Sequence, residues 1–211
     1  MKLKTSSAFT LIEMLTVMAV IAILASLIVS VQAFAQRKAA TSRAEGEIRT
    51  MMAACESYKG DFGSYPRDTT GATSKTDNLD PRMEGNPAKY LDACLVLYRA
   101  ISGDAEDKPD GKPETKGYFE FNPNQLSKNS SGEIRFIQDP FGNSYGYSTA
   151  GAKMEDDYRE DLQKDPKKAR TTTPKGFSPN FDLWSTGGVI NKTAKDAAGL
   201  DSDRKRWVKN W

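Results

Sequence analysis

The chain has 211 residues, of which 38% are hydrophobic and 27% are charged, and its formal net charge is only +2. This balance excludes nucleic-acid binding through bulk positive charge. The sequence has no histidine, which excludes His-based triads and His metal sites, and its two cysteines cannot form a four-thiolate zinc site. Apolar residues concentrate in the first 35 positions, which is typical of a membrane-anchored or processed chain with a modest soluble part.

The first 60 residues predict one long helix. A polar leader, residues 1–8, precedes an apolar segment, residues 9–34, in which residues 14–31 carry no charge. As a helix, this uncharged stretch measures about 27 Å, close to the thickness of a bilayer core. Further along, apolar residues recur at the spacing of a helix with one buried face: Ala40, Ala44, Ile48, Met51, Cys55, Tyr58 and Phe62. We predict a continuous helix from about residue 9 to about residue 59, ended by the two glycines that follow.

Glu13 is a charged residue inside the apolar segment, and three interpretations treat it differently. A plain signal anchor leaves it unexplained, although a carboxylate costs about 2.5–3.5 kcal/mol near the middle of a membrane. A cleaved secretory signal, with an A-x-A site at residues 33–35, leaves it unexplained too. Cleavage after Ala8 instead creates an amino group on Phe9, and the amine of a neighbouring subunit can then neutralise Glu13 in a packed bundle of helices.

The sequence AFTLIEM, residues 8–14, resembles the class III signal of type IV pilins and type II secretion pseudopilins. In that family a prepilin peptidase cuts before the Phe, methylates the new amine and leaves the helix attached. The resemblance implies cleavage between Ala8 and Phe9, N-methylation of Phe9, and a role for Glu13 in assembly. The chain departs from the family at Ala8, where relatives nearly always have Gly, and at Ser30, where many have Pro.

The remaining residues, 35–211, predict a globular domain that includes the second half of the long helix. Asn86 followed by Pro87 is typical of a helix start, and Gly103 suits the end of that helix. The densely charged residues 153–175 predict an insertion with one short helix near its start, at about residues 156–164.

Short strands and a turn follow the second helix in the prediction. The strands are expected at residues 118–121, 134–138, 145–148 and 181–185. Residues 139–143, DPFGN, predict a tight turn between two of them. We therefore predict an α+β fold in which a long N-terminal helix packs against a small antiparallel sheet.

Segments of this globular part resemble the major pseudopilin of type II secretion, the G type. They are residues 58–66, residues 139–143 with Tyr145 and Tyr147, residues 181–185 and residues 210–211. The resemblance implies a pilin-like fold and favours this subfamily over ordinary pilins. Insertions without a clear counterpart lie around residues 68–86, 104–116 and 150–178.

Residues 142–146 match the G-x-S-x-G pattern of a nucleophile elbow, centred on Ser144. The flanking residues predict a hairpin turn, and the chain has no histidine to act as the base, so we favour a turn over a catalytic serine.

Cys55 and Cys94 lie on the two predicted helices. In an oxidising periplasm they can form a disulfide, or they can pack as two small buried thiols. The sequence leaves both alternatives open because it does not give the distance between them.

The resemblance also implies a calcium site in the loop after the last strand. G-type pseudopilins bind calcium there through backbone oxygens and Asp side chains, and hard oxygen ligands suit this ion. The candidate ligands are the side chains of Asp196, Asp201 and Asp203 and the backbone oxygens of Leu183 and Ser185. The glycines at 187 and 188 depart from the family pattern, and a solvated charged loop is the alternative.

The resemblance implies a structural subunit of a type II secretion pseudopilus, and not an enzyme. Such a subunit waits in the bacterial inner membrane as a single-pass protein with its globular domain in the periplasm. It then joins its own copies in a periplasmic filament. Its further partners are prepilin peptidase, an inner-membrane assembly platform and minor pseudopilins. No nucleic acid is expected among its partners. The alternatives are a type IV pilin of a surface fibre and a monomeric anchored binding protein.

Overall fold

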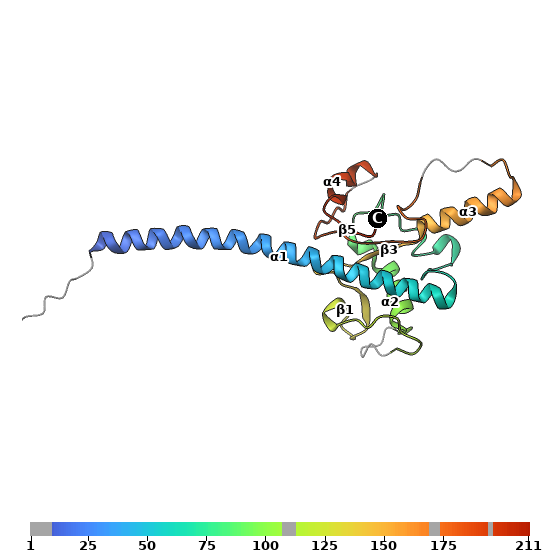
Figure 1. Cartoon of the computed structure of the whole chain (residues 1–211), viewed down its shortest axis with the longest axis horizontal. Coiled ribbons are helices and arrows are strands. Elements are labelled where there is room, and N and C mark those ends of the chain that lie inside the picture. The colour runs from blue at the N-terminus through green and yellow to red at the C-terminus, as the bar shows by residue number, and fades with distance from the viewer. Residues whose placement is uncertain (1–9, 107–112, 169–173, 194–195) are drawn as a thin grey trace, which may run out of the picture. The chain divides into compact units, whose positions relative to one another are not determined.

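The computed structural model describes residues 10–106, 113–168, 174–193 and 196–211, and for residues 27–31 it describes only the backbone. The chain divides into two compact units, Met1–Ala40 and Thr41–Trp211. The boundary predicted from the sequence falls slightly earlier, after residue 34. Helix α1 (Leu11–Phe62) contributes its first part to one unit and its second part to the other (Figure 1).

Helix α1 confirms the predicted long helix and continues through Gly60 to Phe62. Gly63 has a φ of 75°, and its amide donates a hydrogen bond to the carbonyl of Lys59 at 2.8 Å. Gly63 rather than Gly60 therefore ends the helix, because a left-handed residue closes the last turn whereas a helical glycine only weakens it.

The second helix, α2 (Leu91–Ser102), lies where the sequence predicts one. A short 3-10 helix, η2 (Pro87–Lys89), precedes it, and the side chain of Asn86 caps this turn by accepting a hydrogen bond from the amide of Ala88 at 3.1 Å. Gly103, with a φ of 77°, ends α2. The predicted helix is thus confirmed, in two successive pieces.

The described residues form two small antiparallel sheets instead of the one sheet that the sequence predicts. One sheet pairs β1 (Leu126–Lys128) with β2 (Ile134–Ile137). The other has the order β3 (Gly146–Ser148), β4 (Asp182–Ser185), β5 (Val208–Lys209). The predicted strands at 134–138, 145–148 and 181–185 are confirmed as β2, β3 and β4, whereas β1 and β5 are additional.

The turn at residues 139–143 joins these two sheets. Just outside the strands, an isolated antiparallel bridge pairs Gln138, which follows β2, with Ser144, which precedes β3. Asp139 stabilises the turn, because its Oδ1 atom accepts hydrogen bonds from two backbone amides within it, at 3.0 and 2.8 Å. The predicted turn is therefore confirmed, but it connects two sheets rather than two neighbours in one.

The predicted strand at residues 118–121 is wrong, because this stretch is irregular. The amides of Tyr118 and Phe119 both donate to the carbonyl of Ile101, at 2.7 and 2.9 Å. These amides satisfy an otherwise unpaired carbonyl in the last turn of α2 and are thus not available to a strand partner.

Helix α3 (Ala150–Lys164) is longer than the short helix predicted in the charged insertion. The hydroxyl of Thr149, just before the helix, hydrogen-bonds to the buried carboxylate of Asp77 at 2.7 Å. Arg67 forms ion pairs with Asp77 at 2.7 Å and with Asp156 of α3 at 2.6 Å. Contacts with the segment around residue 77 thus support α3, and local sequence does not reveal them.

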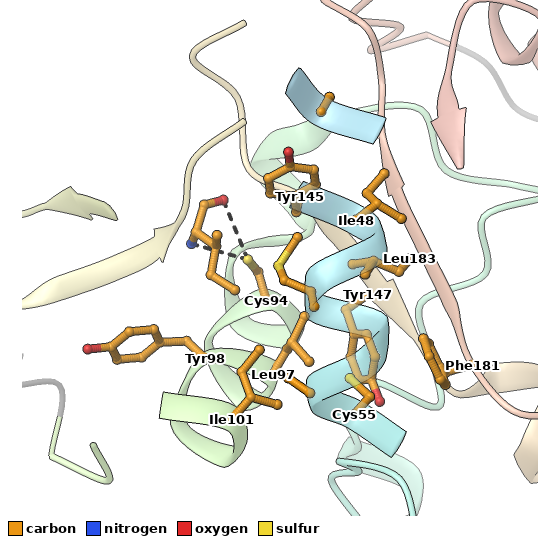
Figure 2. Packing of buried hydrophobic residues seen from close by; sticks show 14 of the residues in the cluster. Ile48, Cys55, Cys94, Leu97, Tyr98, Ile101, Tyr145, Tyr147, Phe181 and Leu183 are labelled. Carbon is orange, nitrogen blue, oxygen red and sulfur yellow. Dashed lines mark hydrogen bonds between the residues drawn. The ribbon is translucent and has the colours of Figure 1, made fainter. Parts of the chain in front are cut away.

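The remaining short elements are η1 (Gly71–Thr73), η3 (Pro123–Gln125), η4 (Ala198–Leu200) and α4 (Asp201–Arg204). The core of the second unit gathers side chains from the second part of α1, from α2 and from the strands (Figure 2). Ala44, Ile48 and Cys55 confirm the predicted buried face of α1. Phe62 does not, since it is 63% exposed.

Candidate functional site

Glu13 caps the start of α1 from within its first turn. Its Oε2 atom accepts hydrogen bonds from the amide and the hydroxyl of Thr10, at 2.8 and 2.7 Å. The amide of Glu13 donates to the Thr10 hydroxyl at 3.3 Å. This is a capping box, in which two side chains satisfy each other's backbone amides, and its T-x-x-E pattern is visible in the sequence. Glu13 therefore stabilises its own helix, a role that we did not predict from the sequence.

The first unit exposes many apolar side chains. Each of the following is more than half exposed: Leu11, Ile12, Met14, Leu15, Val17, Met18, Val20, Ile21, Ile23, Leu24 and Phe34. Exposed apolar surface on this scale marks a site of interaction with another protein or with lipid. Among the residues that the structure describes, none of the helices combines the length and hydrophobicity required for a membrane span. Ala8 and Phe9, the predicted cleavage and methylation sites, lie outside the described residues.

The three predicted calcium-binding carboxylates each have a partner within the chain. Asp196 accepts a hydrogen bond from the amide of Gly199 at 2.8 Å, and Asp203 accepts one from the side-chain amide of Asn191 at 2.8 Å. Asp201 forms an ion pair with the guanidinium of Arg204.

The two predicted backbone ligands lie in β4. The carbonyl of Leu183 accepts a hydrogen bond from the amide of Asn210 at 3.2 Å, and Ser185 pairs with Val208 of β5. In the described part of the chain, no three Asp, Glu, Cys or His side chains lie close enough to hold a metal ion. The predicted set therefore does not fit calcium as it is placed here, and calcium binding stays an untested prediction.

Cys55 and Cys94 are both free and buried in this structure. The sulfur of Cys94 accepts a hydrogen bond from the amide of Ile137 at 3.3 Å and donates one to its carbonyl at 3.7 Å (Figure 2). Burial raises the pKa of Cys55 to about 12 and that of Cys94 to about 11. The structure thus shows the packed thiols, and the disulfide is left to experiment.

Ser144 lies in the turn region, as predicted, and not at the top of a nucleophile elbow. It is buried, and its hydroxyl donates to the carbonyl of Tyr145 at 2.9 Å. Nearby, the hydroxyl of Ser185 and the carboxylate of Asp139 hydrogen-bond at 2.5 Å. Burial raises the pKa of Asp139, although these hydrogen bonds oppose the shift. These polar groups connect the turn to β4 and have no reactive arrangement.

The amino-acid sequence was compared with protein families, with known proteins and with solved structures. Residues 3–29 match the family described as the prokaryotic N-terminal methylation motif, a range that includes residues 3–8 of the predicted leader, Phe9 and Glu13. The chain is also similar to the type II secretion system core protein G of Pseudomonas aeruginosa. The two sequences are 27% identical over 154 residues, which is 72% of this chain and 80% of that protein. No solved structure matches the chain. The motif and this relative together confirm the resemblance to G-type pseudopilins, and the α+β architecture agrees with a pilin-like fold.

Proposed function

We propose that this chain is a structural subunit of a type II secretion pseudopilus, and that it acts by assembly rather than by catalysis. The observation that carries this proposal is the N-terminal methylation motif at the start of a helix whose apolar side chains are exposed. Similarity to a core protein of type II secretion over most of both chains supports the choice of a secretion filament.

Processing is the first step of the proposed function. A prepilin peptidase removes residues 1–8 and methylates the new amine of Phe9. The apolar segment that follows then anchors the subunit in the inner membrane, with the second unit in the periplasm. The basic residues Lys2 and Lys4 support this orientation, because they precede the uncharged stretch at residues 14–31 and are still present when the unprocessed chain enters the membrane.

Assembly is the second step. The exposed apolar side chains of one N-terminal segment pack against those of other copies. Head-to-tail contacts between identical chains need not close, and they then produce a helical filament. Glu13 forms an ion pair with the Phe9 amine of an adjacent copy. A misplaced subunit would leave one of these two charges unpaired in apolar surroundings, which costs free energy and so disfavours that placement.

The further partners in this proposal are an inner-membrane assembly platform and minor pseudopilins. A surface fibre built from a type IV pilin is the alternative. The similarity to a type II secretion protein favours the periplasmic filament over that fibre.

Two substitutions at Glu13 test the proposal. Glu13→Val removes both the charge and the capping box, whereas Glu13→Gln can keep the capping box with Thr10 and removes only the charge. Each variant is produced in cells that carry the secretion system. Chemical crosslinking of intact membranes detects multimers, and the amount of exported protein in the medium measures secretion.

We expect both variants to stay in the membrane fraction and to lose both the crosslinked multimers and the secretion. Normal multimers and normal secretion with Glu13→Val would overturn the filament proposal. If Glu13→Gln behaves like the unsubstituted protein and only Glu13→Val fails, the capping box matters and the ion pair does not. Surface fibres with undiminished export after deletion of the gene would instead identify a type IV pilin.

A further inference from the structure

The segment after β4, residues 186–209, is here called the C-terminal loop. It contains a buried, positively charged side chain. Arg204 is only 8% exposed. Arginine is almost never buried without partners, because its charge loses the hydration that water provides. Its neighbours Lys205 and Arg206 are exposed, so the burial is specific to one guanidinium.

The partners of Arg204 are oxygen atoms from two separate segments. Its Nη1 atom donates to the carbonyl of Arg82 at 2.9 Å, and its Nη2 atom donates to the carbonyl of Ala197 at 2.7 Å. Nη2 also bonds to the carboxylate of Asp201. The guanidinium faces the ring of Phe177, 5.6 Å from its centroid. Two carbonyls and a carboxylate are the type of oxygen atoms that calcium takes as ligands.

The C-terminal loop lies against the inserted segment, residues 68–86, for which the pseudopilin resemblance offers no counterpart. Besides Arg82, Gly85 of this segment also contacts the loop, because its carbonyl accepts a hydrogen bond from the amide of Asn191 at 3.1 Å. Leu200 is fully buried beside the same glycine, where an added Cβ would lie 2.4 Å from the Leu200 Cδ2 atom. The insertion thus provides the surface on which Arg204 holds the loop.

The charges of the C-terminal loop disfavour a bound metal ion. The loop contains six Lys or Arg residues and three Asp residues. The three Asp side chains are those already bonded within the chain, including Asp201 with Arg204. A divalent cation that entered here would be repelled by the guanidinium and would have to displace these contacts.

We propose that Arg204 takes the place of a metal ion in this protein, so that the C-terminal loop is ordered without calcium. A guanidinium donates charge-assisted hydrogen bonds in fixed directions, and such bonds are stronger than neutral ones. One side chain can therefore connect the C-terminal loop, at residues 197 and 201, with the segment around residue 82, as a bound ion would. This inference concerns the loop alone and does not depend on filament formation.

The test uses the full chain, purified in detergent, with calcium chloride or with the chelator EGTA. Thermal melting is followed by tryptophan fluorescence, and hydrogen exchange is measured on peptides from residues 186–209. Arg204→Met removes the guanidinium and keeps a long side chain, and Arg204→Lys keeps the charge without the planar fork. Arg206→Met is the control, because it removes a neighbouring exposed cation of the same loop.

For the unsubstituted chain we expect the same Tm and the same exchange of the loop with calcium and with EGTA. Arg204→Met should lower the Tm by about 5 °C or more and increase exchange in the loop, and added calcium should not reverse this. Arg204→Lys should fall between the two, and Arg206→Met should match the unsubstituted chain. A lower Tm or faster loop exchange of the unsubstituted chain in EGTA overturns the proposal. So does a loop that keeps its protection in Arg204→Met. The comparison of calcium with EGTA needs no variant, so it can overturn the proposal even if Arg204→Met does not fold.

Discussion

The hydroxyl of Tyr145 donates a hydrogen bond to the carboxylate of Glu47, and the two oxygen atoms lie 2.7 Å apart. Tyr145 immediately precedes β3, and Glu47 lies on the part of α1 that belongs to the same unit. The ring of Tyr145 is fully buried in the core (Figure 2), and its burial and the nearby carboxylate both raise the pKa of the phenol. This bond therefore connects helix and sheet at the edge of the core.

Tyr145→Phe should destabilise the second unit by about 1–2 kcal/mol, because it leaves the partly buried Glu47 carboxylate without this donor. Tyr65→Phe is the control, since the hydroxyl of Tyr65 donates to the exposed Glu56 of the same helix at 2.9 Å. There we expect an effect below about 0.5 kcal/mol. Urea unfolding measures both free energies. Equal effects of the two substitutions would show that the bond to Glu47 has no special weight.

Gly146→Ala should destabilise the protein by about 1–3 kcal/mol, because the core has no room for the methyl group. An added Cβ would lie 2.1 Å from the Cε2 atom of Trp184, whose indole is fully buried. Gly60→Ala is the matched control: it lies inside α1 with no other group within 4 Å of the added Cβ. It should stabilise by about 0.5–1 kcal/mol through helix propensity. Thermal melting compares the two, and a neutral Gly146→Ala would contradict the tight packing.

Asp182 should make the protein less stable as the pH rises from about 4 to about 6. Burial raises its pKa to about 6, although the amides of Phe177 and Ser178 donate hydrogen bonds to it at 2.8 Å. The nearby Asp80 carboxylate also raises this pKa, whereas Arg82 lowers it. The folded state then binds the proton more tightly than the unfolded state, so the free energy of unfolding falls with pH across this window.

The contribution of Asp182 amounts to at most about 3 kcal/mol. Urea unfolding at several pH values between 4 and 7 measures it, with Asp182→Asn as the non-titrating control. The burial of Asp139 adds a slope of the same sign in both proteins, so the difference between them isolates Asp182. Identical pH profiles of the two proteins would contradict the raised pKa.

The two cysteines should react as free thiols once the protein is unfolded, and not before. Because both are buried and their pKa values are about 12 and about 11, a thiol reagent at pH 8 should not label the folded protein. In denaturant without reductant it should label both Cys55 and Cys94, and only one site in Cys94→Ala. No labelling in denaturant until a reductant is added would demonstrate the disulfide instead.

The mature protein should begin at Phe9 with a methylated amine. Residues 3–8 of the leader, Phe9 and Glu13 lie in the matched methylation motif, which motivates this prediction. Intact mass of the membrane-extracted protein measures it, with cells lacking the prepilin peptidase as the control. Ala8→Gly restores the residue usual in the family and should be cut at least as completely. A mature chain that starts near residue 36, or one that retains residues 1–8 when the peptidase is present, would refute the processing step.

The sequence by itself determined the N-terminal motif, the long helix, α2 and the turn at residues 139–143. Helices follow from contacts between residues three or four positions apart, and caps and turns follow from neighbouring residues, so a short window contains their causes. For the same reason the capping box of Thr10 and Glu13 was available in the sequence and needed only to be recognised.

Only the tertiary structure decided the division into two sheets, the irregular path of residues 118–121 and the burial of Arg204. Strands β1 and β5 have three and two residues, too few for an alternating pattern to identify them. The amides of Tyr118 and Phe119 bond to a helix carbonyl rather than to a strand, which no local pattern indicates. Arg204 stands in a run of basic residues that look alike in the sequence. Its contact with the carbonyl of Arg82, 122 positions away, cannot be seen in the sequence, because a charge is buried only where the fold brings its acceptors together.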